Sequence, residues 1–239
     1  MTQSADEDYG VPIPGRVLPS QQWATTAIKR LPPPGFLDWR EIFGREAPVV
    51  FDVGCGNGRF VISSALARPE VDHIGIEILP VVIRYATRRA NQRGLSNVRL
   101  AVIGAYEFLA QYVAPASVAE IHLYHPQPYR DIEKKHRRLL TPEFFALVHR
   151  SLAAGGLVVM QTDNKAYWQY VRRIAPLLFD FEEQSGRWPD SRQGRTRREI
   201  YARRRGMQIF RGQGRPRPEL TAEAIQQIVH DAPRPNFSA

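Results

Sequence analysis

The stretch that decides the fold is Val49-Val50-Phe51-Asp52-Val53-Gly54-Cys55-Gly56-Asn57-Gly58. Its first five residues have the apolar, β-branched composition of a buried parallel strand. The glycines that follow allow a tight turn and let the backbone approach a ligand closely. Roughly twenty residues later a second apolar run ends at Glu77, where a carboxylate at the carboxyl end of a strand can accept both hydroxyl hydrogens of a ribose. The pattern predicts an adenosine site.

The third glycine indicates which adenosine ligand to expect. Dinucleotide-binding turns follow Gly-X-Gly-X-X-Gly, and the last position of that pattern is Arg59 here. The spacing Gly-X-Gly-X-Gly, with Asp52 two residues before it, is instead similar to the first motif of Rossmann-like methyltransferases that use S-adenosyl-L-methionine. A tight turn without a ligand is the alternative, but three glycines lose more conformational entropy on folding than such a turn requires.

Composition indicates one domain and a polyanionic partner. The 239 residues, 43% of them apolar, can bury one α/β core. An excess of 33 basic over 24 acidic residues gives a net charge of +9, which favours nucleic acid as a partner. The segment 187–217 holds eleven arginines, and Lys134-Lys135-His136-Arg137-Arg138 forms a second basic cluster. We interpret both as phosphate-contacting surfaces, with a general arginine-rich composition as the alternative.

Cysteine content and hydropathy indicate the cellular compartment. The single cysteine, Cys55, excludes an internal disulfide, offers no metal-ligand spacing and favours a reducing compartment. No apolar run reaches the roughly 18 residues of a membrane span, and the start at 1–10 is acidic rather than signal-like. The sequence predicts a cytoplasmic protein without a membrane or metal site, and it leaves open whether the protein is a monomer or a homodimer.

Strand and helix patterns alternate, which predicts an α/β fold with a mainly parallel sheet. Strands are expected at 49–53, 73–78, 98–102, 121–124 and 157–161, and helices at 60–66, 80–92, 105–113, 142–152 and 165–178. Residues 179–183 and 200–203 are expected to pair as a closing antiparallel hairpin. We expect a proline-rich, irregular arm at 1–46, a sheet-forming domain at 47–211, and a tail at 212–239 made of a linker and a helix at 220–230.

From about residue 48 to 206 the chain resembles the bacterial-type tRNA (guanine-N7)-methyltransferase family. The glycine turn and Gly75-Ile76-Glu77 look like its cofactor motifs, and His125-Pro126-Gln127-Pro128-Tyr129 stands where the family has Phe-Pro-Asp-Pro-Trp. Lys135-His136-Arg137-Arg138 is similar to its basic run, and Thr162-Asp163 to its Thr-Asp. Thr196-Arg197-Arg198-Glu199 is similar to its Thr-X-Phe-Glu substrate motif.

The resemblance implies a Rossmann-like class I methyltransferase that uses S-adenosyl-L-methionine to methylate a guanine of tRNA. It places a catalytic position at Gln127. The implied cofactor-binding residues are Asp52, Gly54, Gly56, Gly58, Glu77 and Gly104. The implied substrate-binding residues are Asp163, Thr196, Glu199, Arg137 and Arg138. The alternatives are an ordinary loop hydroxyl for Thr196 and a charge partner of the many arginines for Glu199.

Three polar positions depart from the family pattern. Gln127 replaces the catalytic aspartate, Asp131 replaces a substrate-contacting lysine, and Gly104 replaces an acid near the adenine ring. Guanine N7 has a lone pair and no proton, so its methylation needs alignment rather than a general base. Gln127 keeps one carbonyl acceptor, so we expect weakened or shifted specificity. The alternatives are a weak or inactive RNA-binding homologue, a methyltransferase with another substrate and, last, a dehydrogenase.

Overall fold

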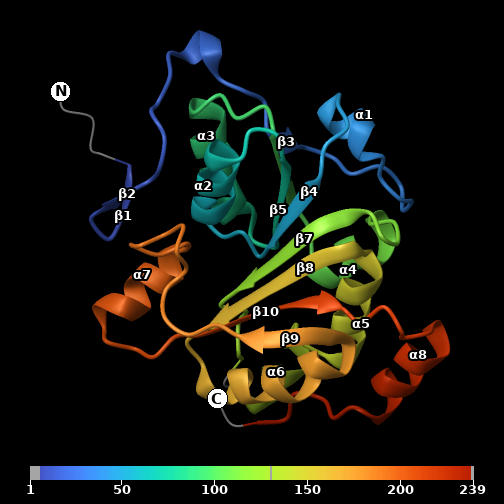
Figure 1. The fold of residues 1–239 in the computed structure, drawn as a ribbon. Coiled ribbons are helices and arrows are strands. Elements are labelled where there is room, and N and C mark those ends of the chain that lie inside the picture. Colours follow the sequence, from blue (N-terminus) through green and yellow to red (C-terminus); the bar gives the residue numbers. More distant parts are fainter. Residues whose placement is uncertain (1–5, 130, 238–239) are drawn as a thin grey trace.

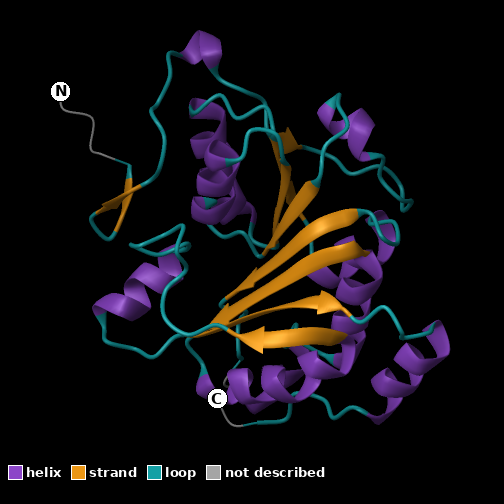
Figure 2. Cartoon of the chain, viewed as in Figure 1, coloured by secondary structure: helices purple, strands orange, loops and turns teal. Residues whose placement is uncertain are grey.

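The computed structural model describes residues 6–129 and 131–237. Its main feature is an eight-stranded sheet in the order β3-β6-β5-β4-β7-β8-β10-β9, which crosses the molecule in Figure 2. The strands, in that order, are Ala27–Ile28, Val98–Val102, Asp72–Glu77, Val49–Val53, Val118–Tyr124, Leu152–Thr162, Phe210–Pro216 and Phe179–Glu183. The first six are parallel, and β10 is antiparallel to both of its neighbours. The expected α/β fold with a closing hairpin is confirmed.

Helices cover both faces of the sheet. α2 (Arg59–Ala67) and α3 (Pro80–Gln92) pack together on one face. α4 (Ala105–Tyr112), α5 (Pro142–Ser151) and α6 (Lys165–Leu178) follow one another across the other face, and α8 (Ala222–Asp231) packs on α5 (Figure 1). The larger core lies under α4 to α6, where Phe51, Phe108 and Phe144 are fully buried. Since the amphipathic patterns of these helices are local, their predicted positions agree closely with the structure.

The predicted partner strand of the hairpin is wrong. Residues 200–203 belong to α7 (Arg197–Arg204), and β9 pairs with β10 instead. Most of the predicted linker, from 212 to 216, is therefore a strand that crosses the predicted domain boundary at 211. Its glycines allow close strand approach, because a Cβ on Gly212 would lie 2.5 Å from Cζ of Phe181. The predicted C-terminal helix is confirmed as α8.

The N-terminal arm has more structure than its prolines predicted. Strands β1 (Glu7–Asp8) and β2 (Val11–Pro12) form a small hairpin, η1 (Ser20–Gln22) follows, and β3 joins the edge of the main sheet. After β3 comes α1 (Trp39–Phe43), whose Trp39 packs edge-on against Phe51. Figure 1 shows the β1–β2 hairpin beside α7, far from it in sequence. The first five residues of the predicted arm lie outside the described residues.

Candidate active site

The glycine turn joins β4 to α2 at the carboxyl edge of the parallel strands. Gly54 and Gly56 have φ values of +76° and +54°, and among the described residues no atom lies within 4 Å of a Cβ built on either one. Gly58, at +82°, is the N-cap of α2 and lies so close to α3 that a Cβ would meet Cβ of Ala86 at 2.8 Å. The turn therefore presents bare backbone to open space, as close approach of a ligand requires.

Glu77 connects the end of β5 to this turn. Its Oε2 accepts the Gly56 N–H at 3.2 Å, and its Oε1 accepts the backbone N–H groups of Ile78 and Leu79 at 2.9 and 3.1 Å. These bonds orient the carboxylate, and its oxygens retain lone pairs for ribose hydroxyl groups. The geometry fits the predicted ribose-binding role.

Asp52 is a buried acid at the end of β4, just before the turn. It is 2% exposed, and its Oδ2 has no hydrogen-bond partner among the residues that the structure describes. Burial and the neighbouring Glu77 raise the pKa of Asp52 to about 8. An orphaned acceptor of this kind fits a cationic ligand group, such as the ammonium of S-adenosyl-L-methionine.

A cleft of about 430 Å³ opens over Asp52 and the turn. Besides the turn, it is lined by residues of β7 and its following loop, α7, α3 and the N-terminal hairpin: Tyr124, His125, Thr196, Arg197, Arg198, Tyr201, Val82 and Tyr9. Tyr9 lies 5.6 Å from the ring of Tyr201, and the Arg197 guanidinium lies 5.0 Å above the Tyr9 ring. Of these, sequence analysis named Thr196 as a site residue and placed His125, Arg197 and Arg198 in family-like motifs, but it missed Tyr9, Tyr124 and Tyr201. No local pattern marks them, because they meet only in the folded chain.

His125 and Asp163 connect the loop after β7 to the end of β8. His125 Nδ1 lies 2.8 Å from Asp163 Oδ1, and its Nε2 lies 2.9 Å from the Gln161 amide nitrogen. The Trp188 indole N–H donates to Gln161 Oε1, so the Gln161 amide donates to His125 Nε2, and the proton of a neutral imidazole lies on Nδ1. This network holds His125 at a φ of +51°, a strained value for a non-glycine residue.

Asp163 lies at the predicted place but is already bound. Its Oδ2 accepts Arg198 Nη2 at 2.6 Å, in addition to the His125 contact on Oδ1. Burial alone would raise the pKa of Asp163, but hydrogen bonds from His125 and Arg198 hold this pKa well below its usual range. A substrate that used this carboxylate would have to share it with Arg198 or displace it.

Glu199 does not face the cleft. Its side chain is fully buried, with Oε2 accepting the Arg195 N–H at 2.8 Å and Oε1 accepting Arg211 at 2.7 Å as well as Arg203. Thr196 caps α7 by accepting the Glu199 N–H, and it also lines the cleft. The predicted contact between Glu199 and guanine is therefore wrong for this structure, since the ion pairs with arginine occupy its carboxylate.

The remaining predicted positions divide into exposed and structural residues. Gln127 and Arg137 are exposed, and Gly104 is the N-cap of α4 beyond β6. Arg138 is 3% exposed and donates to the carbonyls of Pro128 and Tyr129 and to two carbonyls of the C-terminal tail. It therefore anchors the loop that carries Gln127 and is not available to bind RNA, contrary to prediction.

The arginine-rich segment is mostly bound to the protein itself. Guanidinium groups within 187–217 donate to carboxylates, to Tyr124 or to backbone carbonyls; they belong to Arg187, Arg195, Arg198, Arg203, Arg211, Arg215 and Arg217. These bonds hold α7 and its flanking loops against the sheet. Seven of the eleven arginines are nonetheless exposed, namely Arg187, Arg192, Arg197, Arg198, Arg204, Arg205 and Arg215. The interpretation of this segment as a phosphate-contacting surface therefore stays a prediction.

Within 6–129 and 131–237, no three His, Cys, Asp or Glu side chains gather in a way that could hold a metal ion. In the same ranges, no helix is long and apolar enough to cross a membrane.

Comparison with known proteins identifies the family. Residues 46–211 match the family described as "Putative methyltransferase". The tRNA (guanine-N(7)-)-methyltransferase of Alkalilimnicola ehrlichii is 30% identical over 205 residues, covering 82% of this chain and 86% of the relative. The Shewanella woodyi protein of the same name is 32% identical, covering 69% and 68%. The chain belongs to the tRNA (guanine-N7)-methyltransferase family. It spans 63% of the Pseudoalteromonas atlantica relative, which is 34% identical.

As a member of this methyltransferase family, the protein uses S-adenosyl-L-methionine as its cofactor, and the orphaned Asp52 oxygen and open glycine turn fit that molecule. When bound, the cofactor supplies an electrophilic methyl group on a sulfonium. The fold agrees with the crystal structure of the 16S rRNA methyltransferase KamB, with a TM-score of 0.57 over 81% of this chain and 99% of that protein. The identity there is 16%, so this likeness concerns the fold alone.

Proposed function

We propose that the protein transfers a methyl group from S-adenosyl-L-methionine to N7 of a guanine in tRNA. The observation that carries the proposal is a single cleft that is lined by Asp52, the glycine turn, His125 and α7. The segments predicted to bind the cofactor and the substrate thus line one opening. The names of the curated relatives support tRNA as the substrate.

Each side of the cleft contributes a different part of the reaction. Asp52 would hold the cofactor's ammonium and Glu77 its ribose, as their burial and orientation allow. The guanine would enter from the side of the loop after β7, where the exposed Gln127 offers a carbonyl acceptor to the N1–H or N2–H edge. Because N7 has a free lone pair, rate would come from alignment of the acceptor with the methyl group.

Two observations favour the alternative of weak activity. Gln127 lacks the charge of the family's aspartate, and Arg198 already occupies one oxygen of Asp163. A guanine would therefore meet one neutral acceptor and one carboxylate shared with arginine. We expect slow methylation rather than none, since neither residue blocks the space over the turn.

Nucleoside analysis tests the proposal. Unmodified tRNA would be incubated with protein and cofactor, digested and analysed by mass spectrometry, with cofactor binding measured by calorimetry. We expect N7-methylguanosine, and we expect Gln127→Asp to raise its rate about tenfold, because a charged acceptor roughly doubles hydrogen-bond strength. A different methylated nucleoside would identify another target. Bound cofactor without any RNA methylation, in both proteins, would contradict the proposal.

A further inference from the structure

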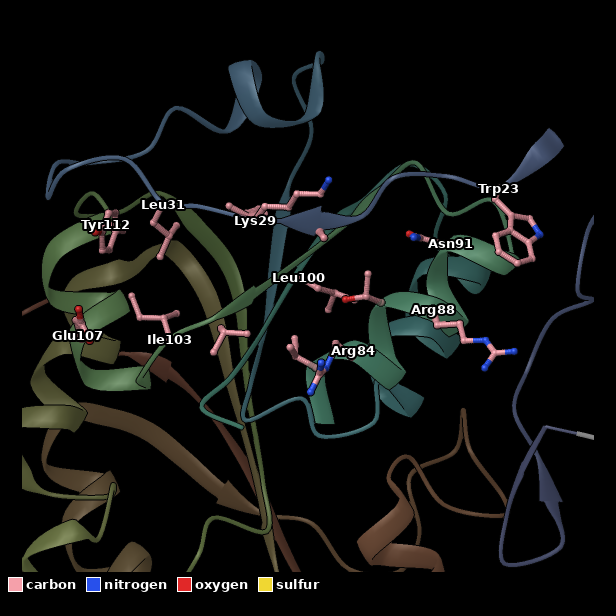
Figure 3. Close-up of a pocket in the computed structure, with 15 residues that line it drawn as sticks. Trp23, Lys29, Leu31, Arg84, Arg88, Asn91, Leu100, Ile103, Glu107 and Tyr112 are labelled. Carbon is pink, nitrogen blue, oxygen red and sulfur yellow. The ribbon is translucent and has the colours of Figure 1, made fainter. Parts of the chain in front are cut away.

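A second opening lies at the β6 edge of the sheet, between α3 and α4 (Figure 3). It is a groove of about 750 Å³ that shares no lining residue with the methyl-transfer cleft. β3 has only two residues and pairs with Leu100 and Ala101, so it leaves the carboxyl end of β6 uncovered. Ile83, Leu100 and Ile103 give the groove an apolar lining, while Leu31 covers it from the N-terminal arm.

Cations border this groove. Lys29 comes from the arm, and Arg84 and Arg88 lie one turn apart on α3, all three exposed. None of the three forms a hydrogen bond or ion pair with any residue that the structure describes, and Glu107 is the one acid among the lining residues. In the segment 187–217, by contrast, most guanidinium groups donate hydrogen bonds to other residues of the protein.

An aromatic side chain stands at one end of the groove. Trp23 is 43% exposed, and its indole N–H donates to the Leu18 carbonyl at 2.9 Å, which orients the ring. An exposed, oriented aromatic ring beside cations is the combination on which nucleic-acid bases stack while phosphates pair with the charges. Neither an acidic peptide nor a membrane surface requires an oriented ring.

α3 connects the two openings. Val82 lines the methyl-transfer cleft, and the next two residues, Ile83 and Arg84, line the groove. An RNA held in the groove would therefore pass directly beside the cleft.

We propose that this groove binds an unstacked nucleotide of the RNA substrate, with its base against Trp23 and the apolar lining and its flanking phosphates at Lys29, Arg84 and Arg88. The inference rests on the proposed function and extends it, because it assigns substrate affinity to α3 and the arm. The groove is thus an RNA-contacting surface outside the methyl-transfer cleft.

The charge contribution is tested with the double variant Arg84→Ala/Arg88→Ala. Filter binding of tRNA between 50 and 200 mM salt should show weaker binding and a slope of log K against log salt smaller by about 2, as for two lost phosphate contacts. Arg173→Ala is the matched control, because Arg173 is an exposed arginine on α6, on the opposite face of the sheet. It should change neither quantity.

The stacking contribution is tested with Trp23→Ala. It should weaken tRNA binding about fivefold or more with an unchanged salt slope, whereas Trp23→Phe should retain most of the affinity. Unchanged affinity and slope in both the arginine and the tryptophan variants would overturn the proposal.

A kinetic measurement separates this inference from the proposed function. In the arginine variant KM for tRNA should rise while kcat at saturating tRNA is retained and cofactor calorimetry is unchanged. If the wild-type protein binds tRNA through the groove but methylates nothing, the proposed function is contradicted and the RNA-binding role of the groove is supported. If it methylates tRNA and the variant has an unchanged KM, only the RNA-binding role of the groove is contradicted.

Discussion

At the scale of single residues, the site depends on carboxylates whose environments differ. Asp52 is buried beside another acid and has an oxygen without a described partner, so its pKa is raised to about 8. Although burial by itself would raise its pKa, hydrogen bonds from His125 and Arg198 hold the pKa of Asp163 well below its usual range. The two aspartates, both at the carboxyl edge of the sheet, thus differ in protonation at neutral pH. Asp52 can ionise in response to a cation, whereas the ionised Asp163 holds His125 and Arg198 in place.

This difference predicts how cofactor affinity depends on pH. A cationic cofactor favours ionised Asp52, so affinity should rise nearly tenfold per pH unit between pH 6 and 7.5, and level off near the pKa of about 8. Calorimetry would measure it. Asp52→Asn is the control, because the cofactor's own amine titrates equally in both proteins. It should bind more weakly with a much flatter profile, and equal slopes in the two proteins would rule out Asp52 as the titrating group.

At the scale of elements, α7 and β10 are held together by one buried carboxylate. Glu199 near the start of α7 accepts hydrogen bonds from Arg203 on the same helix and from Arg211 on β10. Arg211 is itself 7% exposed, so neither charge can be satisfied by water. Burial alone would raise the pKa of Glu199, but the hydrogen bond from Arg211 outweighs this effect and the pKa is lowered. The helix that lines the cleft is therefore fixed from behind.

Glu199→Gln should destabilise the protein by about 3 kcal/mol at pH 7, because it leaves buried arginine charge without a counterion. A carboxyl group with a lowered pKa stabilises the fold above its unfolded pKa and loses that effect as pH falls through the folded value. The difference in unfolding free energy should accordingly shrink below about pH 4. Urea denaturation checks both points, with the exposed Glu182→Gln as control. A difference that stays constant down to pH 3 would contradict the assignment.

At the scale of the whole molecule, the N-terminal hairpin joins three distant parts of the chain. Asp8 is 2% exposed and bonds to Asn57 in the glycine turn and to Arg59 at the start of α2. Asp6 pairs with Arg89 on α3 and with Arg93, the C-cap of that helix. Together with Tyr9, which lines the cleft, these contacts make the hairpin one wall of the cleft.

Asp8→Asn should therefore lower both stability and cofactor affinity. It removes the counterion of Arg59, which is 4% exposed, at a cost of about 3 kcal/mol, and it loosens the turn through Asn57. Thermal unfolding and cofactor calorimetry would measure the two effects. Glu7→Gln on the same strand is the matched control, since Glu7 is exposed, and it should change neither. Normal cofactor affinity in a destabilised Asp8→Asn would show that the hairpin is structural only.

Local patterns in the sequence were sufficient for the parallel strands, the helices on both faces, the glycine turn and the family, because periodicity, capping and turn chemistry act over a few residues. Folding alone decided which charges remain free. Glu199 was expected at the substrate and is instead bound to Arg203 and Arg211, while Arg84 and Arg88, in an ordinary helix pattern, are exposed. Most of β10 was predicted as a linker, because its strand partners β8 and β9 are not recognisable from its own sequence. An ion pair or a close strand contact joins residues far apart in the chain, and no local pattern specifies its partner.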